Sequence, residues 1–268
     1  MPHHRRIVLS IETGTSRDTI RRAAAWARLL DLEMHGIFVE DEAVHGLAAY
    51  AFAREFRLPT HAWQPIDPDR IADDFRHAAN TAKRQFDAIA AATGVRAAFQ
   101  VLRGDPSGEV AQLLCASDIV VLTEPSLGSE GLTQSFLRSW QSACGSAASV
   151  LLLPPGRIRT HGPVAALSFG DKGARTAAHI AGRTGEALVL LGPTKPLVLP
   201  PTLTEERVRR RALPAIAETT LANALGDLRE QLLVLDRDGL SADQERAVLR
   251  VATSRTTPVL LVGTPADI

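Results

Sequence analysis

Short segments rich in Val, Ile and Leu recur along this chain, and stretches with helical periodicity separate them. The clearest apolar segments are 7–11, 118–122 and 150–154. Strands this apolar are typical of a parallel sheet that helices cover on both faces. Alternation of strands and helices therefore predicts an α/β fold built on a doubly wound parallel sheet.

The first 156 residues are predicted to contain one complete sheet domain. Asp105 is expected to cap a helix in which Pro106 takes the first helical position. The expected strands are 7–11, 33–39, 95–102, 118–122 and 150–154, and the expected helices are 20–30, 71–92, 106–114 and 132–144.

The second half repeats this order in a shorter form. LLVLD at 232–236 mirrors IVVLT at 119–123, and PVLLV at 258–262 mirrors SVLLL at 149–153. An internal repeat explains both pairs. The other expected elements are strands at 163–168, 187–191 and 208–213 and helices at 174–184 and 219–226.

The repeat predicts two α/β domains, 1–156 and 161–268, joined by the sequence PPGRIRT. The last strand of each domain is expected to be an edge of its sheet. We expect 150–153 and 259–262 to pair antiparallel within the chain, because this pairing would cover both edges at once. The chain would then be an intrachain pseudo-dimer.

Aromatic residues are concentrated in the first half, where eleven of the twelve lie between Trp26 and Trp140. The segment 42–68 has no counterpart in the second half, and no sheet strand is expected there. Phe52 and Phe56 are four residues apart, so a helix would place them on one apolar face. Three interpretations stay open: a flap packed on its own domain, a lid over the strand ends, or a self-association surface that includes Tyr50, Phe52 and Phe56.

Composition excludes several partners. Thirty basic residues balance thirty acidic ones, and the one Arg-rich run, 207–211, follows two Glu, so we expect a solvated edge and no nucleic acid. No apolar run approaches the roughly 20 residues that a bilayer crossing requires, which predicts no membrane partner. The amino-terminal residues lead directly into a strand without an apolar leader, so a cytoplasmic protein is expected.

Few residues carry the patterns of catalytic or metal sites. Cys115 and Cys144 lie in apolar helical patterns and are expected to be buried thiols. The histidines lack the spacing of metal ligands, so no metal site is predicted. The chain has no nucleophile elbow, no P-loop and no dinucleotide-binding glycine motif, which indicates a protein that is not an enzyme.

The order of these segments resembles the universal stress protein family, in particular its tandem members with two domains in one chain. The resemblance covers nearly the whole length and is weaker in the second half. It is carried by IVLSIETGTS at 7–16, FVEDE at 38–42, AFAREF at 51–56, VLRGDP at 101–106 and ASDIVV at 116–121.

Nucleotide-binding members of this family carry a glycine loop after the fourth strand, and the resemblance implies a site on this chain. Glycines let backbone N–H groups approach phosphate oxygens. Gly128 and Gly131 match the loop, but Gln141 and Ser142 stand where the family has Gly-Ser or Gly-Thr. The implied nucleotide-binding residues are Glu12, Val39 through its backbone, Gly128, Gly131 and Ser142.

The resemblance implies a non-enzymatic stress-response protein, and the departures from the glycine loop predict weakened or lost nucleotide binding. Asp171 could echo the acidic turn of the first half, but the second half has no glycine loop, so we expect a degenerate copy. The alternative is a module that binds ATP, another adenine nucleotide or a different small ligand through the first domain. An enzyme is the third hypothesis, and no positioned nucleophile, base or metal site supports it.

Overall fold

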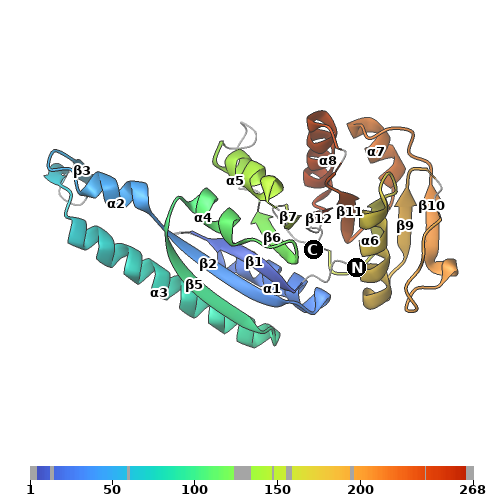
Figure 1. The fold of residues 1–268 in the computed structure, drawn as a ribbon, viewed down its shortest axis with the longest axis horizontal. Coiled ribbons are helices and arrows are strands. Elements are labelled where there is room, and N and C mark those ends of the chain that lie inside the picture. Colours follow the sequence, from blue (N-terminus) through green and yellow to red (C-terminus); the bar gives the residue numbers. More distant parts are fainter. Residues whose placement is uncertain are drawn as a thin grey trace.

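One ten-stranded sheet runs through the molecule, and helices cover both of its faces (Figure 1). The structure, a computed structural model, describes residues 5–12, 15–58, 61–123, 134–146, 148–154, 159–193, 196–238 and 240–263. The first half contributes β1 (Arg6–Ile11), β2 (Glu33–Asp41), β5 (Ala97–Gly104), β6 (Asp118–Thr123) and β7 (Ser149–Leu153). The second half contributes β8 (Val164–Leu167), β9 (Leu188–Leu191), β10 (Val208–Arg211), β11 (Leu232–Asp236) and β12 (Val259–Val262).

The two halves of the sheet have the same strand order. From the centre outward, the first half runs β7-β6-β1-β2-β5 and the second runs β12-β11-β8-β9-β10. Neighbouring strands are parallel within each half, whereas β7 and β12 are antiparallel, with Leu151 opposite Leu260. The expected α/β fold class and the expected pairing of 150–153 with 259–262 are therefore confirmed.

Polar contacts reinforce this central junction. Arg237 follows β11, and its guanidinium donates to the carbonyl oxygens of Ser146 and Ala148 at 2.7 and 2.9 Å. At the other end of β7, Arg22 donates to the Pro154 carbonyl oxygen at 2.6 Å. One arginine thus binds the backbone at each end of β7, Arg237 before the strand and Arg22 after it.

The helices of the first half begin and end at residues with clear local signals. Ser16 and Asp105 cap the first turns of their helices, and Asp105 accepts from Gly108 N at 2.6 Å, as the sequence predicted. Gly94 ends the long helix in the left-handed conformation, at φ 68°. These helices are α1 (Arg17–Leu30), α2 (Glu42–Ala48), α3 (Pro68–Thr93), α4 (Pro106–Leu113) and α5 (Gln134–Gly145).

Helices α6 (Asp171–Thr184), α7 (Glu218–Leu225) and α8 (Ala242–Arg255) complete the second half. No described helix is long and apolar enough to cross a membrane. The Arg-rich run 207–211 includes β10, whose outer edge has no strand partner in the described part of the chain. Arg209 and Arg210 are exposed there, so the expected solvated edge is confirmed.

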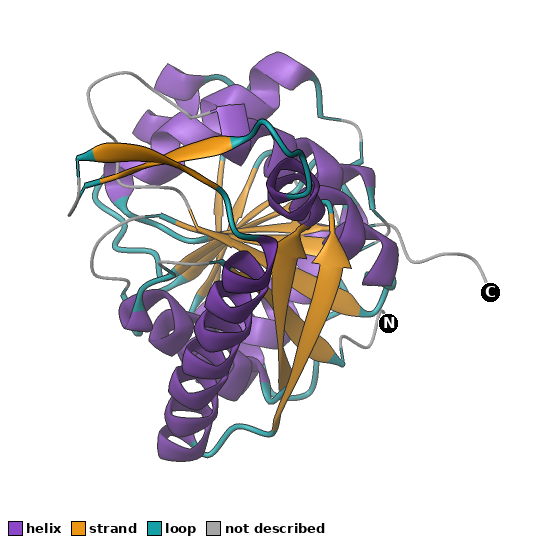
Figure 2. Ribbon diagram, turned by 90° about the vertical axis from the view of Figure 1, so that its left-hand side faces the viewer, coloured by secondary structure: helices purple, strands orange, loops and turns teal. Residues whose placement is uncertain are grey.

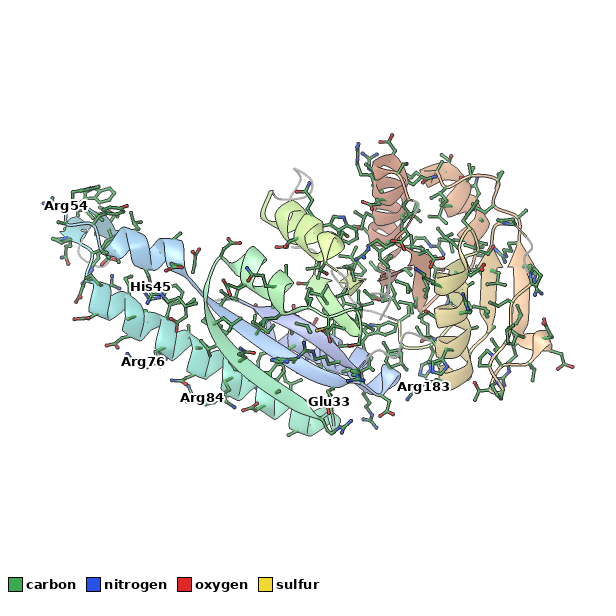
Figure 3. All side chains as sticks on the ribbon, in the orientation of Figure 1. Glu33, His45, Arg54, Arg76, Arg84 and Arg183 are labelled. Atoms are coloured by element: carbon green, nitrogen blue, oxygen red, sulfur yellow. The ribbon has the colours of Figure 1, made fainter. Side chains whose placement is uncertain are left out.

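The segment 42–68 differs from the prediction. After α2 it forms a small antiparallel sheet of β3 (Arg54–Arg57) and β4 (Ala62–Pro65), so the expected helical face of Phe52 and Phe56 is wrong. Phe52 lies in a turn and Phe56 in β3. This hairpin stands at one end of the long axis, where Figure 3 labels Arg54, and it faces the viewer in Figure 2. Its aromatic side chains are exposed, so a flap that buries them on its own domain is also wrong.

The two cysteines have different environments. α4 ends at Leu113, so Cys115 lies beyond the helix and is exposed, which corrects the expectation of a buried thiol. Cys144 lies in α5 and is half-buried, and burial raises the pKa of its thiol to about 12. Cys144 therefore carries almost no thiolate at neutral pH.

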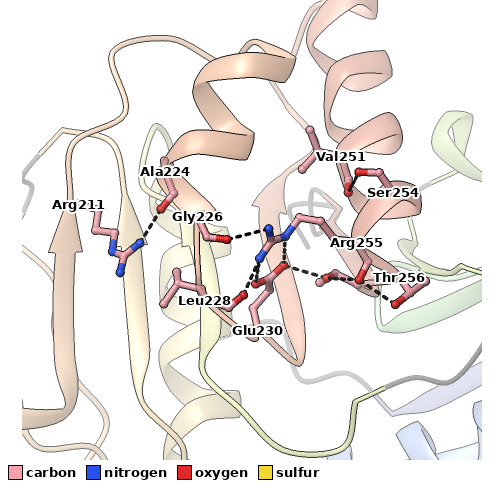
Figure 4. Close-up of polar contacts among 10 residues, drawn as sticks. Arg211, Ala224, Gly226, Leu228, Glu230, Val251, Ser254, Arg255 and Thr256 are labelled. Carbon is pink, nitrogen blue, oxygen red and sulfur yellow. Dashed lines mark hydrogen bonds and ion pairs between the residues drawn. The ribbon is translucent and has the colours of Figure 1, made fainter.

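Each half also buries one carboxylate near the amino end of its fourth strand. Asp118, the first residue of β6, accepts two hydrogen bonds from the Arg6 guanidinium at 2.8 and 2.9 Å. Glu230, just before β11, does the same with Arg255 at 2.7 and 2.8 Å (Figure 4). Thr257 adds a third hydrogen bond to Glu230 at 2.8 Å. Both carboxylates are buried, so both depend on these partners for compensation.

Candidate functional site

A pocket of about 300 Å³ opens where β1 ends, between the start of α1 and the middle of α3. Open α/β sheets place ligands at the carboxyl ends of their strands, and this pocket lies at that edge of the first half. Its floor is apolar and its rim is polar. The lining residues are Ile11, Glu12, Thr15, Ile20, Phe38, His77, Ala78, Thr81, Ala82 and Gln85.

The packing of α3 on the sheet explains why space remains here. Phe86 of α3 is fully buried against Gly36 of β2, where a Cβ atom would lie 2.7 Å from the ring. Only glycine lets the helix come this close. One and two turns earlier, α3 presents the small residues Ala82 and Ala78 instead of a second large side chain. Space therefore remains between α3 and the end of β1, above the buried side chain of Phe38.

A tight turn after β1 fixes the acidic side of the pocket. The backbone N–H of Glu12 donates to Thr15 Oγ1 at 2.8 Å, and the N–H of Thr15 donates back to the Glu12 carbonyl oxygen at 3.0 Å. Ser16 then caps α1. These bonds hold the chain in place while the Glu12 side chain stays exposed at the pocket mouth.

The chemistry of the lining restricts the ligand. Phe38, Ile11 and Ile20 provide an apolar floor, while a carboxylate, two hydroxyls, an amide and an imidazole stand around it. Such a surface suits a flat or partly apolar ligand that donates and accepts hydrogen bonds. None of the described lining residues is Lys or Arg, so these residues offer no cation to phosphate oxygens.

The comparisons with known proteins bear on the fold. No family model and no curated protein matches this sequence. A universal stress protein from Archaeoglobus fulgidus is similar to it in structure, with a TM-score of 0.61, 12% identity and coverage of 97% of both chains. The fold is that of solved universal stress proteins.

Two further structures from Pseudomonas aeruginosa agree with this conclusion. A putative universal stress protein has a TM-score of 0.54 and 15% identity, and covers 97% of this chain and 94% of its own. A protein of unknown function has a TM-score of 0.56 and 16% identity, with coverage of 97% and 93%. The resemblance predicted from the sequence is thus supported at the level of the fold.

The structure brings two of the predicted site residues together. Ile11 pairs with Phe38, so Glu12, the residue after β1, lies beside Val39, which precedes the end of β2 at Asp41. The Val39 side chain is buried on the opposite face of the sheet, against Val110 of α4. The expected role of Val39 through its backbone stays a prediction.

Ser142 is not among the described residues that line this pocket. Ser142 lies in the second half of α5, which packs on β6, β7 and α4. Gly128 and Gly131 lie outside the described residues. The lining also includes no residue of 42–68, so the lid interpretation of Tyr50, Phe52 and Phe56 stays a prediction.

Sequence reasoning missed the contribution of α3 to the pocket. His77, Thr81 and Gln85 are spaced four residues apart, which places them in one row along the helix. This polar row runs beside the small residues Ala78 and Ala82. The sequence signal for this pocket was a row of polar residues beside alanines on an amphipathic helix. Within the described ranges, no three His, Cys, Asp or Glu side chains gather closely enough to hold a metal ion.

In the second half, the start of α6 is occupied by a buried carboxylate from the end of β11, the counterpart of β6. Asp236, the last residue of β11, accepts a hydrogen bond from the N–H of Gly173 in the first turn of α6 at 2.7 Å. A Cβ atom on Gly170 would lie 1.9 Å from the other carboxylate oxygen of Asp236. That oxygen is buried and has no hydrogen-bond partner in the described structure. The position is therefore tightly filled.

Burial raises the pKa of Asp236, and the bond from Gly173 and the nearby Lys172 only partly oppose this. Since the folded protein binds this proton more readily than the unfolded chain, the contribution of Asp236 to stability falls as pH rises through its raised pKa. Asp236→Asn keeps an acceptor for Gly173 and removes the charge. We expect the variant to gain stability relative to the wild type at pH 7, and to lose that advantage as pH falls toward 3.8, the ordinary value for Asp.

Thermal unfolding of both proteins across this pH range measures the difference. A relative stability of Asp236→Asn that increases toward acid would contradict the assignment of burial as the dominant effect.

Proposed function

We propose that this chain is a non-enzymatic, cytoplasmic stress-response protein of the universal stress protein type, with two repeats at 1–156 and 161–268. In this proposal the first repeat binds a small ligand in the pocket at Glu12, and the second repeat is a degenerate copy with a structural role. Phosphate-dependent nucleotide binding is weakened or lost.

One observation carries the proposal: the pocket combines an apolar floor with a hydrogen-bonding rim that lacks Lys and Arg. A nucleoside-like ligand fits this surface better than a triphosphate. Its ring would lie against Phe38, and its hydroxyl or amino groups would donate to the Glu12 carboxylate. In the second repeat, the Asp236 carboxylate fills the space at the start of α6, which supports a repeat that binds no ligand there.

The alternative is an adenine-nucleotide module that uses Gly128 and Gly131 as well as Glu12. The two proposals differ in the effect of phosphates. If phosphates contribute nothing, adenosine is expected to bind at least as tightly as AMP or ATP. If the glycine loop holds phosphates, ATP is expected to bind more tightly than adenosine.

Thermal shift and calorimetry with adenosine, AMP and ATP test both proposals. We expect adenosine to stabilise the wild type and Ala82→Leu to abolish the effect, because the larger side chain fills the pocket. Ala88→Leu, on the same helix but exposed, is the matched control and is expected to bind normally.

Three outcomes would contradict the proposal. If none of the three ligands shifted the unfolding temperature, the pocket would not be a site for them. A shift that survives Ala82→Leu would show that the ligand binds elsewhere. Phosphate release that follows the protein through purification and is lost on Ala82→Leu would instead support an enzyme.

A further inference from the structure

The most unusual surface of the molecule is the hairpin of β3 and β4 together with α2. We call residues 42–58 and 61–65 the aromatic projection. It extends from the carboxyl end of β2 to one end of the molecule, away from the second half (Figures 1 and 3). In the described chain, α2 lies against α3 and β5, and Arg70 of α3 binds the hairpin.

The hairpin has its charged face toward the protein. Glu55 accepts a hydrogen bond from Arg57 at 2.7 Å, and Arg70 of α3 binds the same carboxylate. The bonds from Arg57 and Arg70 hold the pKa of Glu55 below its usual value. In most sheets with one solvated face, polar side chains point outward and apolar ones inward. Here the ion pairs take the inner position.

The outer face of the hairpin carries an aromatic pair. Phe56 pairs directly with Trp63 across the two strands, and their ring centroids are 5.5 Å apart. Arg54 lies on the same face by the alternation of the strand. Leu58, the residue after β3, is 72% exposed. This inverted arrangement leaves the aromatic pair in contact with water.

A second aromatic pair extends this surface. Tyr50 and Phe52 stack with ring centroids 5.4 Å apart, and Phe52 is 81% exposed. From the exposed fractions of these four aromatic residues, the rings leave roughly 500 Å² in water, taking about 200 Å² for each side chain. With Leu47 and Leu58 added, the area approaches the roughly 800 Å² that each partner buries in a standard interface.

Several features favour a second copy of this chain as the partner. An isologous interface needs one patch that complements itself, and aromatic rings can pack on identical rings. Exposed charges of both signs lie near the patch, with Arg54 in β3 and Asp69 in the first turn of α3. The formal net charge of the chain is zero, so two copies do not repel each other at long range.

The outer edges of β3 and β4 also have no strand partner among the described residues. An isolated two-stranded hairpin is marginally stable in water, and its free edges can pair with another strand. A partner that covers the aromatic face and an edge would stabilise the hairpin.

We propose that the aromatic projection is a two-fold self-association surface, on which Phe52, Phe56 and Trp63 pack against the same residues of a second copy. This inference is independent of the ligand pocket, because the pocket lining and the projection share no residue. The dimer would join two molecules at their first halves, while the β7–β12 junction stays within each chain.

Sedimentation velocity and light scattering over a range of protein concentrations test the proposal with the full chain. The wild type is expected to have about twice the chain mass of 28.8 kDa at micromolar concentration. Leu58→Asp is expected to reduce the mass to that of one chain, since the two-fold axis brings the new charges of both copies into an apolar interface. Val198→Asp makes the same change at a residue that is 86% exposed and outside the projection, and is expected to remain dimeric.

A second variant, Phe52→Ser with Trp63→Ser, removes apolar area without adding charge and is expected to be monomeric as well. Circular dichroism verifies that each variant is folded, and exposed positions make this the expected result. A wild type that stays monomeric throughout the concentration range would overturn the proposal. This is also the result expected if the surface binds a different protein. Dimers that persist in folded Leu58→Asp would also overturn it.

Discussion

Replacing Phe86 with Ala is expected to lower the free energy of unfolding by about 3–5 kcal/mol. The ring is fully buried between α3 and the sheet, packed on Gly36 and on the ring of Phe99 at a centroid distance of 5.5 Å. Its removal leaves a cavity that a rigid helix and strand cannot close. Because domains are stable by only about 5–15 kcal/mol, the loss would be a large part of the total.

Urea unfolding followed by circular dichroism measures this effect. Val198→Ala, a truncation of a highly exposed residue, is the control and is expected to change the stability by less than about 0.5 kcal/mol. If Phe86→Ala were as mild as this control, α3 would not be held on the sheet by Phe86, and the packing that leaves the pocket open would be explained wrongly.

Arg255→Ala is the second change with a large expected effect, about 3–5 kcal/mol. The variant would leave the fully buried Glu230 with only the Thr257 hydroxyl as a side-chain partner. Arg255 also donates to the carbonyl oxygens of Gly226 and Leu228, which follow α7 (Figure 4). The Glu230 hydrogen bond raises the pKa of Arg255, so Arg255 remains charged, and its loss leaves a buried carboxyl group without its main partner.

Two comparisons separate the buried pair from general effects of charge. Arg250 lies on the same helix and pairs with Glu218 at 3.4 Å, but both side chains are exposed, so Arg250→Ala is expected to cost less than about 1 kcal/mol. The double variant Glu230→Leu with Arg255→Met removes both charges and is expected to recover most of the loss. A double variant as unstable as Arg255→Ala would show that burial of an unpaired charge is not the cause.

Much of the fold could be predicted because local patterns and packing agree. The apolar runs at 118–122 and 150–154 are strands in the sheet, Asp105 caps its helix, and the final strands of the two halves pair as expected. In these elements, the period of the apolar residues, the caps and the need to cover sheet edges all favour the same structure.

The hairpin at 54–65 shows where such reasoning fails. Phe52 and Phe56 have helical spacing, but Phe56 and Trp63 are placed by cross-strand pairing, which depends on residues in another strand. The direction of the apolar face was also unpredictable, because the ion pair of Glu55 with Arg70 joins residues that are fifteen positions apart.

The candidate site was predictable only in part. Glu12 was implied by the resemblance of the first strand and its acidic turn to the universal stress protein family. The pocket itself depends on the absence of bulk at Ala78 and Ala82 and on the close approach of α3 at Gly36. A cavity arises from packing between distant elements, and the sequence shows no local pattern for it.

The same limit applies to the second half, where the sequence indicated degeneration only through a missing glycine loop. The structure places the buried Asp236 carboxylate against the start of α6, with no space for a Cβ atom at Gly170. The two halves share a strand order, but the pocket of the first half lies at the end of β1, whereas the buried carboxylate of the second half comes from β11, the counterpart of β6.

Hydrogen exchange with and without adenosine tests this difference between the halves most directly. We expect the ligand to slow exchange in peptides that contain Glu12, Phe38 or residues 77–85, and to leave peptides that contain Gly173 or Asp236 unchanged. Ala82→Leu should remove the protection. Protection at Gly173 and Asp236, or none at the first-half pocket, would contradict the assignment of ligand binding to the first half.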